Sequence, residues 1–377
     1  MSLCSKAKVL PVLAILLGIS AAGCSAPQAV SEAVSYPVEH EHEFGGVYIK
    51  IPIEDFLASG FSFGDSVRVE FSNGFVLEDI PFYNGYYVPE GDPLLIGYPG
   101  YPYIKAANNN GKDLWDEAGL SESDTAVVRM NIPGKYLAIM NLRDMPLISD
   151  RNAFESDEVF ASFRSLSGGR MKENVIFRSS SPVDDTYGRA KYASSLMEKY
   201  GIRFVINMTD SVETLENHLS SDGAESTYYA QLYKEGNVLM PQINTRYEEK
   251  ENKTAAANAL RTMCQKEGPY LIHCSLGKDR TGFIAILLEM LAGADYEEIV
   301  EDYMMTYDSF YHVTKTGSPD KYNTVVDEDF TGLIRHIVTD PSVDLQTADL
   351  FSWAEKYLRE GGMSDADLET LKSVIME

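Results

Sequence analysis

Residues 270–291 most constrain the fold of this chain. The short apolar segment Tyr270-Leu271-Ile272 has the length of a strand, and Gly282 to Leu291 is an almost wholly apolar stretch with the length of a helix. Between them lies the polar stretch 273–282. A buried strand followed by a buried helix must be covered on both sides, so this region predicts an α/β fold with a strand-to-helix turn at 273–282.

The rest of the second half repeats this alternation of strand and helix. Short apolar segments predict strands, and helical spacing of apolar residues predicts helices. We therefore expect a largely parallel sheet flanked by helices over residues 146–377. The predicted strands are 175–177, 204–206 and 238–240, and the predicted helices are 187–200, 254–267 and 297–307.

The first half has the pattern of a β domain over residues 43–145. Val67, Val69 and Phe71 alternate with polar residues, and Ser72-Asn73-Gly74 then predicts a hairpin turn. Residues 83–103 are rich in Tyr, Gly and Pro, a composition that argues against a helix or a central strand there. This half predicts a small all-β barrel or sandwich that spaces or docks the second domain.

Three segments of this half resemble the C-terminal β-domain of the S-adenosylmethionine hydroxide adenosyltransferases. They are Ile104 to Gly111, Gly119-Leu120 and Asp124 to Val128. The resemblance implies a β fold and carries over no activity.

The N-terminus is typical of a targeting segment. Lys6 and Lys8 precede an apolar run over 9–23 that is too short to span a bilayer. Small residues then precede Cys24, which resembles the cleavage box of bacterial lipoproteins. We expect a signal peptide at 1–23, lipidation at Cys24, a flexible tether at 24–42 and an extracytoplasmic location on a bacterial membrane. An ordinary signal peptide with an incidental cysteine is the alternative.

The net charge of the chain limits the kinds of molecule that it can bind. The chain has 32 Lys and Arg against 57 Asp and Glu, for a formal net charge of −25. This balance excludes nucleic-acid binding through a general basic surface. An anionic substrate would have to be captured by a locally positive site. The four cysteines lack the spacing of a zinc site, and we expect no metal.

The turn at 273–282 has the residues that phosphate chemistry requires. Backbone N–H groups at the start of a helix can surround an anion, and the Arg280 guanidinium can donate two hydrogen bonds to one phosphate. The same positive field stabilises a thiolate at Cys274, which could attack a bound phosphoryl group. Gly277 lets the backbone bend, and the Thr281 hydroxyl would lie near the sulfur. The expected substrate-binding residues are Ser275, Leu276, Gly277, Lys278 and Thr281.

The stretch His273-Cys274-Ser275-Leu276-Gly277-Lys278-Asp279-Arg280-Thr281-Gly282 resembles the Cys-x5-Arg signature of the protein tyrosine phosphatase superfamily, most closely its secreted bacterial tyrosine and lipid phosphatases. Phe177 to Ser180, Gly201 to Asn207 and Tyr303 to Tyr307 resemble further elements of that family. The resemblance spans roughly residues 149–310. It implies a phosphocysteine intermediate, action on phosphotyrosine and, as in some members, also on phosphoserine or phosphothreonine, and a loop-organising role for His273. The loop supplies the positive charge itself, so we expect no cofactor.

Two carboxylates compete for the role of general acid, which would protonate the leaving oxygen. Asp279 lies in the loop itself, and the resemblance favours it. Asp210 follows a predicted strand, at the kind of strand end where α/β sites form. Arg178 is interpreted as bracing the loop, with a plain surface charge as the alternative.

Two other functions remain open. Lys278 adds a second cation to the loop, which would suit a phosphoinositide or an inositol polyphosphate. A non-catalytic phosphate-binding module is the other alternative, although the Cys274 and Arg280 pair argues against it. Residues 308–327 have a loop-like composition and could form a mobile cover or a plain connection.

Overall fold

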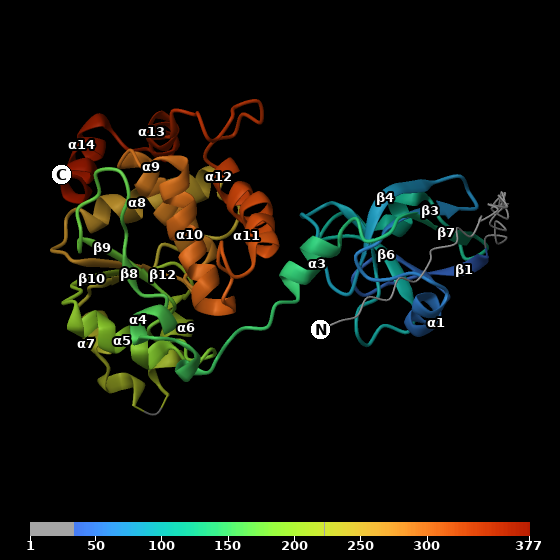
Figure 1. Cartoon of the computed structure of the whole chain (residues 1–377), viewed down its shortest axis with the longest axis horizontal. Coiled ribbons are helices and arrows are strands. Elements are labelled where there is room, and N and C mark those ends of the chain that lie inside the picture. The colour runs from blue at the N-terminus through green and yellow to red at the C-terminus, as the bar shows by residue number, and fades with distance from the viewer. Residues whose placement is uncertain (1–33, 222) are drawn as a thin grey trace, which may run out of the picture.

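The computed structural model describes residues 34–221 and 223–377, which form a β-barrel followed by an α/β domain (Figure 1). The predicted signal peptide, Cys24 and the tether as far as residue 33 lie outside the described residues. Over the described ranges, no helix combines the length and apolar character needed to cross a bilayer.

The N-terminal unit is a closed barrel, as one of the two sequence alternatives predicted. Its strands follow one another in the order β1-β2-β6-β5-β4-β3-β7, and β7 pairs with β1 to close it. Apolar residues alternate along the strands and fill the interior. The strands are β1 (Ser35–His40), β2 (Val47–Ile49), β3 (Ser66–Phe71), β4 (Val76–Tyr83), β5 (Pro93–Ile96), β6 (Ile104–Asn108) and β7 (Thr125–Ile132), with the short helices α1 (Ile53–Ala58) and α2 (Leu114–Ala118) between them.

Two expectations about this unit are wrong. Residues 35–40 were expected in the tether, but they form β1, which pairs with both β2 and β7. Residues 93–96 form β5, which lies between β4 and β6 despite the nearby prolines. Pro93 is the first residue of that strand, a position where the missing N–H is tolerated.

The second unit has the predicted, largely parallel sheet. Its strand order is β11-β10-β12-β9-β8, and only β8 runs antiparallel to its neighbour. The central strand β12 is completely buried. The strands are β8 (Arg164–Ser165), β9 (Ile176–Ser179), β10 (Phe204–Asn207), β11 (Val238–Leu239) and β12 (Tyr270–His273).

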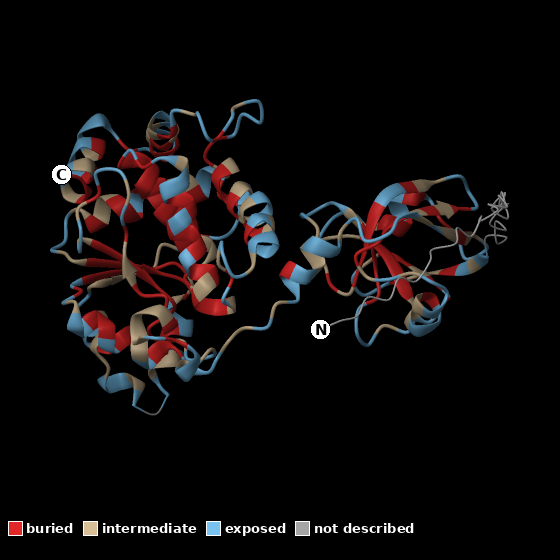
Figure 2. Ribbon diagram, viewed as in Figure 1, coloured by how far each residue is buried: buried red, intermediate tan, exposed pale blue. Residues whose placement is uncertain are grey.

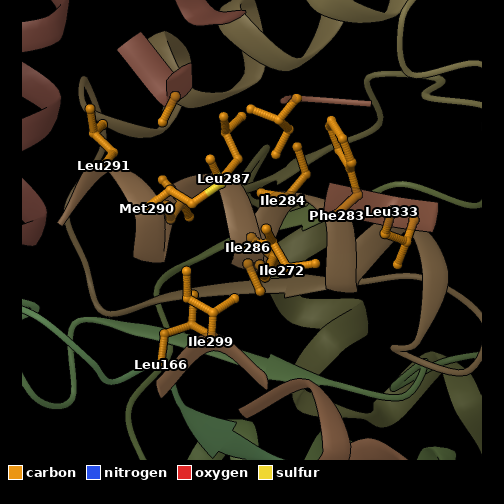
Figure 3. Packing of buried hydrophobic residues seen from close by; sticks show 14 of the residues in the cluster. Leu166, Ile272, Phe283, Ile284, Ile286, Leu287, Met290, Leu291, Ile299 and Leu333 are labelled. Atoms are coloured by element: carbon orange, nitrogen blue, oxygen red, sulfur yellow. The ribbon is translucent and has the colours of Figure 1, made fainter. Parts of the chain in front are cut away.

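Helices cover both faces of this sheet, and their packing explains why α9 is almost wholly apolar. Figure 1 shows α4 to α7 on one face and α8, α9 and α10 on the other. Every residue of α9 from Thr281 onward is buried (Figure 2), and Figure 3 shows Phe283, Ile284 and Leu287 among the buried apolar side chains. The helices are α4 (Asp157–Phe160), α5 (Ala190–Lys199), α6 (Val212–Leu219), α7 (Tyr228–Lys234), α8 (Lys250–Met263), α9 (Asp279–Leu291), α10 (Tyr296–Tyr311), α11 (Pro319–Val325), α12 (Thr331–Arg335), α13 (Leu350–Glu360) and α14 (Asp365–Ile375).

The connection between the two units consists of a helix and a segment without regular structure at 145–150. Helix α3 (Leu137–Arg143) leaves the barrel and contacts α11 of the second domain.

Residues 308–327, expected to be loop-like, are largely helical: α10 continues to Tyr311, and α11 begins at Pro319. Their proposed role as a cover stays a prediction.

Gly277 brings the strand-to-helix turn into close contact with the sheet. Its φ is +70°, and a Cβ at this position would lie 2.3 Å from the Ser179 carbonyl oxygen at the end of β9. Only glycine combines that backbone conformation with that contact. The turn can therefore lie against β9 only because residue 277 has no side chain.

We expect Gly277→Ala to lower the free energy of unfolding by about 3 kcal/mol, from backbone strain and overpacking together. Gly293→Ala is the matched control, because Gly293 has a φ of +78° and open space around it. It should lower the same free energy by about 1 kcal/mol. Urea unfolding of the full chain measures both, and equal losses would contradict the contact.

Candidate active site

The turn at 273–282 lies at the carboxyl end of the parallel strands. His273, the last residue of β12, is opposite Asn207 of β10 and Ser179 of β9. The Met208 N–H donates to the His273 carbonyl oxygen over 3.0 Å, and the Ser181 N–H donates to that of Ser275 over 3.0 Å. The segments after β9 and β10 therefore hold the turn at the edge where α/β proteins bind ligands.

The structure brings Cys274 and Arg280 to the two ends of this turn. Cys274 follows β12 and is buried, with an exposed fraction of 3%. Arg280 lies in the first turn of α9, and its Nη1 donates to the Met208 carbonyl oxygen over 2.9 Å. The first N–H groups of α9 lack acceptors within the helix. The arrangement joins a thiol, a guanidinium and a positive helix end in one loop, which suits an anion facing the sulfur.

Arg178 links the backbone of the turn to α10. Its Nη2 donates to the Gly277 carbonyl oxygen over 2.8 Å, and its Nη1 pairs with Asp302 of α10. Arg164 also pairs with Asp302, with Nε to Oδ1 at 2.7 Å. Burial opposes the charge on Asp302, but the two arginines outweigh it and lower the pKa of that carboxyl. Arg178 is thus buried in the structure, and the surface-charge alternative does not describe it.

Glu289 of α9 completes this buried cluster. Burial and the Asp302 charge raise its pKa, and neither of its carboxyl oxygens has a hydrogen-bond partner among the described residues. Sequence reasoning missed both Asp302 and Glu289. Asp302 is 124 residues from Arg178, so no local spacing connects them.

The two candidate acids have different surroundings. The Asp279 side chain is half exposed at the start of α9, where its Oδ1 is 2.8 Å from Lys278 Nζ. Asp210 is buried, accepts from Asn207 Nδ2 over 2.8 Å, and lies 3.7 Å from His218 Nε2. The Asp279 carboxyl group is accessible to a ligand bound in the turn. The Asp210 carboxyl group could reach such a ligand only after its hydrogen bond with Asn207 is broken.

His273 is held as a neutral imidazole. It is completely buried, and burial is the main reason that its pKa falls to about 3. Its Nδ1 is 3.4 Å from the Cys274 carbonyl oxygen. A group that stays uncharged at neutral pH and contacts the loop backbone fits an organising role.

The other polar side chains of the loop are those of Ser275, Thr281 and Lys278. Ser275 Oγ is 3.4 Å from Thr209 Oγ1, and the buried Thr281 hydroxyl has no hydrogen-bond partner in the described part of the chain. Lys278 Nζ contacts Asp279 and, over 3.3 Å, the hydroxyl of Tyr307 on α10.

The part of the chain that contains this turn matches a known protein family. A family model described as the tyrosine phosphatase family matches residues 138–377. The triple specificity protein phosphatase PtpB of Mycobacterium tuberculosis is 26% identical over 46% of this chain and 64% of its own length. A tyrosine-protein phosphatase of Nostoc commune is 50% identical over 12% of this chain and 16% of its own length. The chain thus spans less than two thirds of either relative.

A solved structure with a matching region is the core catalytic domain of the PP-IP phosphatase SIW14 from S. cerevisiae. It is 18% identical, covers 47% of this chain and 98% of that chain, and has a TM-score of 0.25. The family assignment rests on the family model, which covers more than half of the sequence and includes the whole turn, α9 and α10. This chain belongs to the tyrosine phosphatase family.

Proposed function

We propose that this protein is a cysteine-dependent phosphomonoester phosphatase that acts on phosphotyrosine. One observation carries the proposal: the buried Cys274, which follows β12, and Arg280, in the first turn of α9, lie on either side of the same short turn. The printed names of the two relatives, one a triple specificity phosphatase and one a tyrosine-protein phosphatase, support the same chemistry.

The proposed reaction has two steps. The Cys274 thiolate attacks phosphorus, the bond from phosphorus to the phenolic oxygen breaks, and the leaving oxygen takes a proton from the general acid. Water then attacks the phosphocysteine and gives a proton to the carboxylate left by the first step; the sulfur–phosphorus bond breaks, and phosphate and the thiolate are released. Arg280 and the α9 N-terminus stabilise the phosphoryl oxygens in both steps. His273 and Arg178 hold the loop in shape and do not touch the reacting atoms.

The two alternatives have less support. Lys278 is the reason to consider a phosphoinositide or an inositol polyphosphate, and its ammonium group contacts Asp279 and Tyr307, with its side chain 15% exposed. A purely phosphate-binding module would not require the thiol. A phosphate-release panel of phosphotyrosine peptides, phosphoserine peptides, phosphoinositides and inositol hexakisphosphate distinguishes these substrates.

Cys274→Ser should lower turnover of phosphotyrosine at least about 100-fold while leaving folding and phosphate binding intact, because the covalent route has no substitute. Arg280→Lys should also fail, since an ammonium cannot replace a two-donor guanidinium. Cys264→Ser is the control, because Cys264 is a free cysteine that follows α8. Steady-state phosphate release measures all three, and retained activity in Cys274→Ser would reject the nucleophile.

The general acid is tested by leaving-group dependence. Asp279→Asn should slow the hydrolysis of phosphotyrosine by about 100-fold, and slow that of an aryl phosphate with an acidic phenol far less. Asp210→Asn should show no such difference between the two substrates. The reverse pattern, with the leaving-group dependence in Asp210→Asn, would assign the acid to Asp210.

We also propose that Cys24 is lipidated and attaches the protein to the outside of a bacterial membrane. The support is the basic and apolar leader followed by small residues and cysteine. Cys24→Ala should move the protein to the soluble fraction or leave an unprocessed precursor. Mass spectrometry of the mature N-terminus checks this, and a mature chain beginning elsewhere than Cys24 would refute it.

A further inference from the structure

The barrel has a pocket of about 520 Å³ beside the loop that joins β1 to β2. Four aromatic side chains line it, those of Phe44, Tyr86, Tyr98 and Tyr101, together with residues 107–111 at the end of β6. The volume lies in the range of about 300–1,000 Å³ that is typical of small-molecule sites. The barrel therefore has room for a ligand of its own; we call this space the aromatic pocket.

Two of the aromatic side chains are open to solvent. Phe44 is 74% exposed and Tyr98 is 44% exposed, and they are the two aromatic residues among the exposed large hydrophobic side chains of residues 34–221 and 223–377. Single exposed apolar side chains are common on protein surfaces. Two that line the same pocket form an apolar surface, which indicates a place where another molecule binds.

A buried ion pair fixes the shape of the pocket. Lys105 Nζ is 2.7 Å from Glu41 Oε2, and the two side chains are 0% and 8% exposed. The other contacts of the pair are with the aromatic residues. Glu41 accepts from the Phe44 N–H over 3.2 Å, and the Lys105 ammonium lies 5.1 Å from the ring centre of Tyr101 and 5.9 Å from that of Tyr86. The pair thus holds the backbone of Phe44 and two tyrosine rings around one space.

The charges around the pocket favour an uncharged ligand. None of the described residues that line it has a charged side chain. Glu41 neutralises Lys105, and the chain carries a net charge of −25, so an anion would find no free positive charge here. A cation would be repelled by the Lys105 ammonium, which already lies beside the rings of Tyr86 and Tyr101.

The orientation of the rings favours a puckered ligand over a flat one. The ring of Tyr98 is inclined by 43° to that of Tyr86 and by 46° to that of Tyr101, with centre distances of 6.3 and 5.4 Å. A flat heteroaromatic ring stacks best on rings that are parallel to it. Inclined rings instead form a concave apolar surface, which can contact the C–H groups of a puckered ring from several sides.

The polar groups of the pocket require a ligand that donates hydrogen bonds. Asn108 Nδ2 donates to the Lys112 carbonyl oxygen and to Glu117 Oε2, and Asn109 Nδ2 donates to the Val88 carbonyl oxygen over 2.6 Å. The two amide oxygens remain, and within the described residues neither accepts a hydrogen bond. Hydroxyl groups can donate to them. A proline-rich peptide also packs on aromatic rings, but its backbone offers mainly acceptors.

We propose that the aromatic pocket binds a neutral carbohydrate. The rings of Tyr86, Tyr98 and Tyr101 contact the C–H face of a sugar ring, and the amide oxygens of Asn108 and Asn109 accept from its hydroxyl groups. A sugar combines the required features, because it is uncharged, puckered, apolar on one face and rich in donors. The inference goes beyond the proposed phosphatase reaction and does not depend on it.

The experiment measures sugar binding to the full chain by isothermal titration calorimetry. The probes are three neutral trisaccharides: cellotriose, maltotriose and chitotriose. At least one should bind with a Kd of about 1 mM or lower. Tyr98→Ala and Phe44→Ala should each raise that Kd at least about 10-fold, because each removes an apolar contact. Ile132→Ala is the control, since Ile132 is 48% exposed on the same barrel and lies outside the pocket.

The variants at exposed positions should keep the urea midpoint of the wild type, so that a loss of binding is not a loss of folding. No binding of any of the three sugars at about 10 mM would overturn the proposal. Binding that is the same in Tyr98→Ala, Phe44→Ala and wild type would overturn it as well, because the sugar would then lie elsewhere.

Two other ligands test the chemical class. Hexaproline represents a proline-rich peptide, and adenine represents a flat heteroaromatic ring. If either binds more tightly than all three sugars and is lost in Tyr98→Ala, the carbohydrate assignment is wrong. Cys274→Ser should bind the sugar as the wild type does. The calorimetry therefore tests the aromatic pocket separately from phosphate release, which tests the proposed function.

Discussion

The buried guanidinium of Arg178 is the interaction on which the candidate site depends. It binds the Gly277 carbonyl oxygen on one side and Asp302 on the other, and Asp302 also binds Arg164. The turn, β9 and α10 are thus joined at one point that water cannot reach. Losing one partner would leave a buried charge without compensation, so the cluster holds the turn in a single arrangement.

Close contacts of the backbone also fix the main chain of the turn around Arg178. Gly277 lies against the Ser179 carbonyl oxygen, and the N–H groups of Met208 and Ser181 donate to the carbonyl oxygens of His273 and Ser275. The apolar helix α9 extends from the turn into the core (Figure 3), so the start of the helix cannot shift without repacking it. A thiol and a guanidinium presented by such a turn need little reorganisation to meet an anion.

Much of the architecture could be predicted because it follows from local pattern. In the first half, apolar residues that alternate with polar ones predicted the β domain, and in the second half, strands that alternate with helices predicted the parallel sheet. The Ser72-Asn73-Gly74 turn predicted the hairpin of β3 and β4. The errors came where context outweighs pattern. Residues 35–40 look like a linker, yet they form a barrel strand because β2 and β7 both supply partners. Pro93 begins a strand that pairs on both sides, which composition alone argued against.

The sequence by itself determined the chemistry of the turn, because Cys274, Gly277, Asp279 and Arg280 lie within seven consecutive residues and a strand and a helix of unmistakable character flank them. Only the tertiary structure decided what surrounds that turn. Asp302 lies on another element, α10, and sequence spacing carries no information about its contact with Arg178, 124 residues away. Folding brings them together because buried charges must find opposite charges wherever the packed elements place them.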